Sequence, residues 1–247
     1  MKKHNIGRGP AALAEQKALL IALSDDLTLP LLQIRSSLEL LEHADFSKKT
    51  AREQSRIMLM SAENGLQLTE AYRLVLQLEK LHELPLEPVA IGAVLEEVAH
   101  QLSPYAWEYS TRVEVDVQGR LAPVLAHPPS LAAAIQCLSS SLIRAQVGQK
   151  KDKNYRIILG AHRAGGEIST GVFTNMQGLS DRTLRAARSL VGNSRQPMNS
   201  LPSGAASGVL IADVLCAAMW QPLRAAAHRN MNGLAVTIPA SKQLQFV

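Results

Sequence analysis

Two helical patterns joined by a short loop constrain the fold of this chain more than any other feature of its sequence. From Leu20 to Leu41 apolar residues recur every three or four positions, which indicates a helix that packs along one seam close to the heptad repeat. A second helical pattern runs from about Lys48 to Leu81, and its apolar residues fall on more than one face. The loop between the patterns, residues 43–47, is so short that the two helices are expected to pack antiparallel.

A single helical hairpin cannot bury all of these apolar faces, so the pattern predicts that a second hairpin covers them. The simplest source is another copy of the chain, which gives a symmetric four-helix bundle. We therefore expect a homodimer held together by a helical dimerisation domain at residues 11–84.

The pattern changes after Leu84, where Pro85 and Pro88 interrupt the helical periodicity. Short alternating runs then predict strands at 111–117, 155–159, 171–173 and 234–238. Helical patterns between them lie at about 91–102, 130–147, 181–191 and 208–220. The sequence therefore predicts an α+β chain, in which the hairpin is followed by a second domain, residues 85–241, built from a sheet covered by helices.

The composition excludes several classes of protein. Apolar residues make up 47% of the chain and charged residues 19%, unlike disordered, collagenous or disulfide-stapled chains. No stretch approaches the roughly 18 apolar residues of a membrane span, and no secretory signal is evident, so we expect a cytoplasmic protein. Cys137 and Cys216 have apolar neighbours, which favours reduced core thiols over a disulfide.

Charge is divided unevenly along the sequence. Residues 1–119 hold 12 Lys and Arg against 17 Asp and Glu, whereas residues 120–247 hold 14 against 4. The basic half suits phosphate, nucleic acid or an acidic protein surface, or is simply a solvated face. The whole chain has only nine Phe, Tyr and Trp residues to stack on bases, so nucleic acid is an unlikely partner.

The segment from Leu23 to Leu41 resembles the phosphoacceptor helix of sensor histidine kinases, whose motif reads Ser-His-Glu-Leu-Arg-Thr-Pro-Leu. Asp25 stands at the position of the phosphorylated histidine, and Asp26 stands where the family has an acidic partner. Proline inside a helix costs about 3 kcal/mol, so its presence in this frame favours the family kink over chance. Four residues match the motif directly: Ser24, Leu27, Pro30 and Leu31.

Three later segments resemble, in the same order, the nucleotide-binding boxes of the family's ATPase domain. Ser141 stands at the Mg-binding Asn. In the adenine-reading box Thr174 replaces the Asp and Met176 replaces the first Gly. In the later glycine box the middle Gly has become Ala206. The resemblance implies vestigial cofactor-binding positions at Ser141, Arg144, Thr174, Gly178, Gly204 and Gly208.

These departures predict a loss of kinase chemistry. The Asp25 carboxylate is a poorer nucleophile than imidazole and would form a mixed anhydride. Ser141 offers Mg²⁺ a shorter and weaker contact than Asn, and Met176 adds a side chain where backbone should approach the nucleotide. We expect no autokinase activity, no bound cofactor and no metal site. In simpler interpretations the acidic pair is solvated, and Gly204 and Gly208 only start a helix.

The resemblance implies a dimeric signalling scaffold or phosphorelay adaptor of a two-component system, similar also to short dimeric histidine phosphotransferases. Such a protein would dock a response-regulator receiver domain or a partner kinase through Asp25, Asp26, Thr28 and Pro30. The alternative is a divergent cytoplasmic histidine kinase or ATPase that still binds ATP and Mg²⁺. A nucleic-acid binder ranks third, and we expect no membrane partner.

Overall fold

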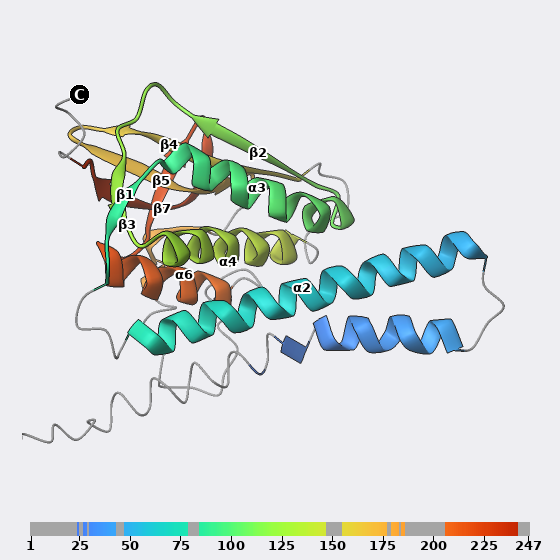
Figure 1. The fold of residues 1–247 in the computed structure, drawn as a ribbon. Coiled ribbons are helices and arrows are strands. Elements are labelled where there is room, and N and C mark those ends of the chain that lie inside the picture. The colour runs from blue at the N-terminus through green and yellow to red at the C-terminus, as the bar shows by residue number, and fades with distance from the viewer. Residues whose placement is uncertain are drawn as a thin grey trace, which may run out of the picture.

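The fold combines two adjacent helices, of which α2 is long, with a sheet that is covered by helices on one side (Figure 1). Residues 30–42 are helical and lie beside α2 (Lys48–Leu78), which begins where Ser47 Oγ accepts a hydrogen bond from the backbone N–H of Thr50. The structure is a computed structural model that describes residues 24, 27–28, 30–42, 47–78, 84–146, 155–176, 179–182, 184–185 and 206–241.

A mixed five-stranded sheet forms the centre of the C-terminal part. Its strand order is β2-β4-β5-β7-β6, with β2 parallel to β4 and every other neighbouring pair antiparallel. Two further strands, β1 and β3, pair as a small antiparallel ribbon. The strands are β1 (Glu87–Val89), β2 (Thr111–Val117), β3 (Val124–Ala126), β4 (Tyr155–Ala164), β5 (Glu167–Thr174), β6 (Arg224–His228) and β7 (Met231–Pro239).

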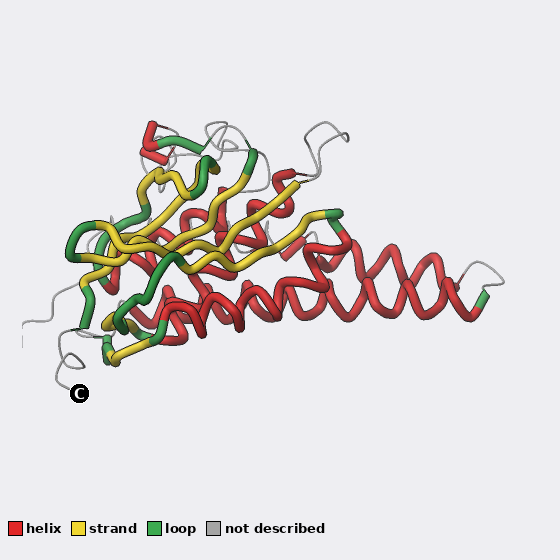
Figure 2. The backbone as a smooth tube through the Cα atoms, turned by 90° about the horizontal axis from the view of Figure 1, so that it is seen from above, coloured by secondary structure: helices red, strands yellow, loops and turns green. Residues whose placement is uncertain are grey.

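Three helices cover one face of this sheet, and the view from above shows the long helical pair extending well beyond it (Figures 1 and 2). The helices are α3 (Ile91–Glu108), α4 (Pro128–Gln146) and α6 (Ala206–Met219). Helix α3 continues past Pro104, which has no backbone N–H to donate to the carbonyl of His100 one turn earlier. Both residues are exposed, so water can reach that carbonyl. None of the helices in the described part of the chain combines the length and apolar composition that a membrane span requires.

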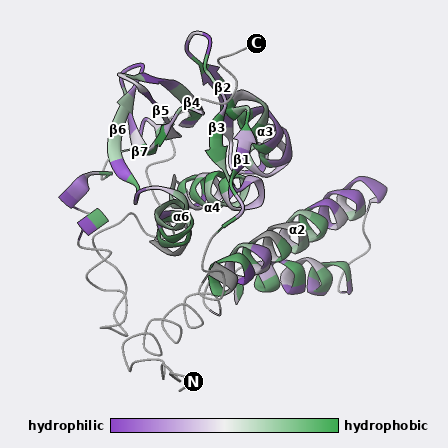
Figure 3. Cartoon of the chain, turned by 60° about the vertical axis from the view of Figure 1, so that its left-hand side comes forward, coloured by the Kyte–Doolittle hydropathy of each residue, from purple (hydrophilic) through white to green (hydrophobic). Residues whose placement is uncertain are grey.

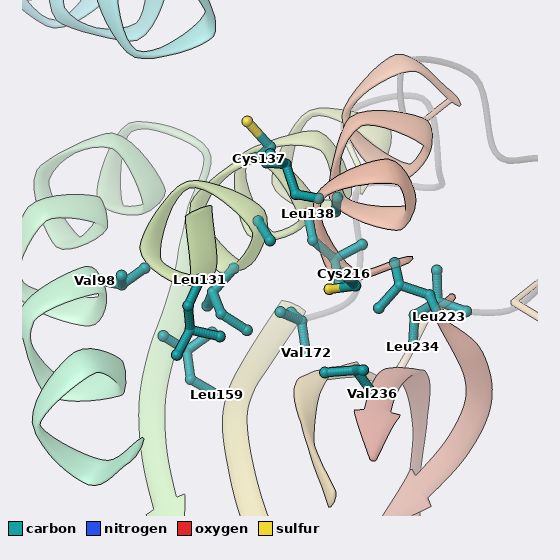
Figure 4. Packing of buried hydrophobic residues seen from close by; sticks show 14 of the residues in the cluster. Val98, Leu131, Cys137, Leu138, Leu159, Val172, Cys216, Leu223, Leu234 and Val236 are labelled. Carbon is teal, nitrogen blue, oxygen red and sulfur yellow. The ribbon is translucent and has the colours of Figure 1, made fainter. Parts of the chain in front are cut away.

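The main core lies between the sheet and these helices (Figure 4). Side chains from α4 and α6, such as Leu138 and Cys216, meet Val172 and Leu234 of the sheet there. Both cysteines are buried and unbridged, as expected.

This core also includes side chains of α2, such as Tyr72 and Val75, and α2 packs against both α4 and α6. The domain boundary predicted after residue 84 stays a prediction, because a shared core does not say whether either part folds alone.

The predicted α+β class agrees with the structure, and the predicted strands and most helices are present. Three strands were not predicted: β1, β3 and β6. Strands β4 and β5 are longer than predicted because they form one hairpin, whose turn uses Gly165 at φ 64°. The helix predicted at 181–191 is described only at 181–182 and 184–185, which are helical.

Candidate functional site

The predicted docking residues of the first helix are described only in part. Asp25 and Asp26 lie outside the described residues. Thr28 is exposed, and its hydroxyl donates a hydrogen bond of 2.8 Å to the carbonyl of Ser24. Pro30 is buried against α2, where a Cβ atom at Gly65 would lie 4.0 Å from the proline ring. Pro30 therefore has a packing role in the helical pair, whereas Thr28 faces solvent.

A chain of hydrogen bonds connects the helical pair to the end of α3. Ser61 Oγ on α2 donates to Gln33 Oε1 at 3.0 Å, and Gln33 Nε2 donates to the hydroxyl of Tyr109 at 3.3 Å. Nearby, the guanidinium of Arg56 on α2 lies 5.0 Å from the centre of the Trp107 ring and also pairs with Glu108. These contacts attach the middle of α2 to the last turn of α3.

Ser141, which the sequence resemblance predicts at the position of a Mg-binding Asn, is a fully buried residue of α4 that faces α6. A Cβ atom at Gly208 would lie 1.8 Å from Ser141 Oγ and 2.5 Å from the backbone carbonyl oxygen of Cys137. The first turn of α6 therefore rests directly on α4, and only glycine fits at position 208 in this arrangement. Two of the predicted cofactor positions are thus brought together, but they are in contact with each other rather than separated by a pocket.

Arg144 lies one turn further along α4 and is also buried. Its Nη2 donates to Ser141 Oγ at 3.2 Å, while its Nε has no hydrogen-bond partner within the described part of the chain. Burial raises the pKa of Tyr105 well above its ordinary value, the neighbouring Tyr109 adds to this, and the positive charge of Arg144 opposes it. Arg144 is therefore a buried cation with one donor left over.

Thr174, at the position of the adenine-reading Asp, is buried at the end of β5. Its hydroxyl accepts a hydrogen bond of 3.2 Å from the backbone N–H of Met176. The Met176 side chain, at the position of the family's first Gly, is itself buried in the main core. The hydrogen bond between Thr174 and Met176 therefore stabilises the turn after β5, and the buried Met176 side chain fixes this turn to the core. The other two predicted positions, Gly178 and Gly204, lie outside the described residues.

Sequence reasoning missed the polar residues that tertiary structure gathers. Tyr105 in the last turn of α3 and Tyr109 directly after the helix are four residues apart, a spacing that brings two rings to one side of a helix, and their ring centres are 4.8 Å apart. This spacing could have indicated the pair of rings from the sequence. Nothing in the sequence indicated the role of Gln33, because its partners Ser61 and Tyr109 are distant in sequence.

No protein-family model matches the sequence, and no curated protein is similar enough to match it. Solved structures do match. Full-length ShkA in complex with AMPPNP aligns with 94% of this chain at 16% identity and a TM-score of 0.53, and this chain spans less than half, 46%, of the ShkA chain. A bacterial phosphotransferase aligns over 92% of this chain and 98% of its own, at 12% identity and a TM-score of 0.51.

A third structure is the histidine kinase ThkA in complex with the response regulator protein TrrA. It aligns with 89% of this chain and 60% of its own at 10% identity, with a TM-score of 0.51. At these identities the likeness establishes the fold alone: the described chain has the fold of histidine kinase catalytic cores.

Proposed function

We propose that this protein is a dimeric signalling scaffold or phosphorelay adaptor of a two-component system, and that it has no autokinase activity. The observation that carries the proposal is the direct contact between Gly208 and Ser141, which fills the place of a Mg²⁺ ligand with packed backbone. Thr174 and Met176 support it. The Thr174 hydroxyl accepts a hydrogen bond from the Met176 backbone N–H, and the Met176 side chain is buried in the main core. The likeness to a bacterial phosphotransferase, which aligns over 92% of this chain, also agrees with the proposal.

The dimer is supported by apolar residues of the helical pair whose side chains the single chain leaves exposed. Figure 3 shows hydrophobic residues along both helices of the pair. Leu31 and Leu38 are seven residues apart on the first helix, and Leu59 and Leu66 are seven apart on α2, which is the spacing of a coiled-coil seam. Six leucines on the pair are between 48% and 70% exposed: Leu31, Leu32, Leu38, Leu40, Leu59 and Leu66. A second copy would bury these faces in a four-helix bundle of two hairpins spanning residues 11–84.

Nucleotide binding is tested by titrating the full chain with a fluorescent ATP analogue, with and without Mg²⁺. We expect no saturable binding in either condition, because reaching Ser141 requires α6 to separate from α4. Incubation with labelled ATP is expected to leave no acid-labile phosphate on the protein. Saturable, Mg²⁺-dependent binding would overturn the proposal in favour of a divergent kinase or ATPase.

One observation favours that second candidate. The Nε of Arg144 is a buried donor without a partner in the described residues, and such a donor suits an anion such as a phosphate group. If the second candidate holds, Arg144→Gln abolishes ATP-analogue binding, while the exposed Arg163→Gln leaves it unchanged. If the protein is instead a scaffold without nucleotide binding, neither variant should bind the ATP analogue.

Receiver docking is tested with a panel of purified receiver domains from the source organism. The carboxylates of Asp25 and Asp26 would face the acidic Mg²⁺-binding pocket of a receiver, so close approach needs a cation between them. Docking is therefore expected to be weak without Mg²⁺ and stronger with it. Asp25→Ala should strengthen metal-free docking. Equal affinities for wild type and variant, with and without Mg²⁺, would refute a docking role for Asp25.

A further inference from the structure

The sheet bends towards the side that faces away from α3, α4 and α6, since residues of its two edge strands, His228 of β6 and Asp116 of β2, meet on that side. Gly171 and Gly233 lie on this outer side, since the adjacent Val172 and Leu234 belong to the core beneath the helices. A Cβ atom at Gly171 would lie 2.2 Å from the Leu234 carbonyl oxygen, and one at Gly233 would lie 2.1 Å from the Val172 carbonyl oxygen. Two glycines at such close approach mark a sharp bend of the sheet.

The bend encloses a second, small apolar cluster on the outer side, formed by Ile158, Phe173 and Ala235. The ring of His228 stacks on Phe173, with ring centres 4.9 Å apart. Both rings lie on the backbone of β4 at Gly160, where a Cβ atom would be 2.8 Å from Phe173 and 3.0 Å from His228. The last residue of β6 is therefore folded over the middle of the sheet.

His228 joins the two edges of the sheet. It ends β6, at one edge, and its Nε2 lies 2.7 Å from Oδ2 of Asp116 in β2, at the other edge. Arg229, the next residue, also reaches Asp116 Oδ2 at 2.7 Å. Burial of the Asp116 carboxyl favours its neutral form, but hydrogen bonds from His228 and Gln118 and the charge of Arg229 together lower its pKa.

A second histidine continues this chain of contacts. His162 Nδ1, on β4, lies 3.1 Å from His228 Nδ1. Ionised Asp116 can only accept, so His228 Nε2 carries the proton of that bond. Neutral His228 then has a lone pair at Nδ1, which assigns the donated proton to His162 Nδ1 and leaves His162 Nε2 as the free basic nitrogen.

We propose that Asp116, His228 and His162 form an acid-sensitive latch that holds the end of β6 over the outer side of the sheet. A single added proton, on either ring, leaves the contact between the rings intact, because one of the two facing Nδ1 atoms can still accept. A second proton puts an N–H donor on both Nδ1 atoms and sets two positive charges face to face at 3.1 Å, so this contact must break.

The charged groups around the latch favour the same outcome. Arg229 adds a third positive charge on the Asp116 carboxylate. The next carboxylate along β2, Glu114, is already held by Arg112 and Arg156. No acidic side chain other than Asp116 contacts the two histidines among the described residues, so the second proton is not compensated.

The sign of the pH dependence follows from the half-buried position of His162. Burial and the charge of His228 lower the pKa of His162 below its ordinary 6.5. The unfolded chain therefore takes up this proton at a higher pH than the folded chain does. Stability is complete above about pH 6.5 and decreases as the pH falls towards the lowered pKa of His162.

Nitrogen-15 NMR of histidine-labelled protein tests the proton assignment. At about pH 8, well above the ordinary histidine pKa, His228 is expected as the Nε2–H tautomer and His162 as the Nδ1–H tautomer. Asp116→Asn, whose amide can donate to His228 Nε2, should shift the His228 tautomer, whereas Glu114→Gln should not. Finding His162 as the Nε2–H tautomer would overturn the latch.

Amide hydrogen exchange tests the opening. Between about pH 7.5 and pH 5, protection of the β6 amides, corrected for intrinsic exchange, should fall at least about tenfold in the wild type. In His162→Gln the fall should disappear, because the amide oxygen accepts from protonated His228 and the amide nitrogen donates to the neutral ring. His100→Gln, an exposed site on α3, should behave as wild type. An unchanged wild type, or an equal fall in His162→Gln, would refute the proposal.

Discussion

Replacing Gly208 with Ala probes the contact between α6 and α4 directly. The added methyl group would lie 1.8 Å from Ser141 Oγ and 2.5 Å from the Cys137 carbonyl oxygen. The hydroxyl can rotate away, but the carbonyl belongs to the backbone of α4 and cannot. Overpacking of this kind costs about 1–3 kcal/mol, and the better helix propensity of Ala returns up to about 1 kcal/mol. We expect a net loss of about 1–2 kcal/mol in the free energy of unfolding.

Urea denaturation of the full chain measures this loss, and two variants serve as controls. Gly92→Ala, in the first turn of α3, meets only a Val117 methyl carbon at 3.8 Å, so its stability should be unchanged or slightly higher. Ser141→Ala combined with Gly208→Ala removes the hydroxyl clash but keeps the carbonyl clash, so it should recover only part of the loss. If Gly208→Ala is as stable as Gly92→Ala, α6 does not rest on α4 as described.

Three further predictions concern the stem, the turn after β5 and the buried thiol. Leu31→Asp with Leu38→Asp should convert the proposed dimer to a monomer in sedimentation, because both charges would enter the proposed bundle, whereas exposed Leu86→Asp should not. Thr174→Val should cost about 1–2 kcal/mol in urea denaturation, because it takes the acceptor from a buried N–H. Burial raises the pKa of Cys216 to about 12, so this thiol should resist alkylation at about pH 8 and react only after unfolding in urea.

Much of the secondary structure followed from local sequence. The alternating Thr111–Val117 segment was predicted with the bounds that it has, because one face of β2 is apolar and the other charged. Strand β6 was missed for the opposite reason. Its three central residues are Ala, which have no preference for a strand, and only pairing with β7 makes the segment extended. The turn between β6 and β7 holds Arg229 and Asn230 in the left-handed conformation, at φ 43° and 62°. Asn tolerates this conformation, but Arg is not a typical residue for it, so the sequence did not indicate the turn.

The nucleotide-binding positions and their substitutions were inferred from the sequence alone, since each depends on residues that are close along the chain, and they stay a prediction. What the substituted residues do was decided by tertiary packing. That Ser141 meets Gly208, and that His228 reaches across the sheet to Asp116, depends on segments that are far apart in sequence and brought together by packing of α6 and bending of the sheet. Local pattern carries information about periodicity and propensity, but not about which distant surfaces meet.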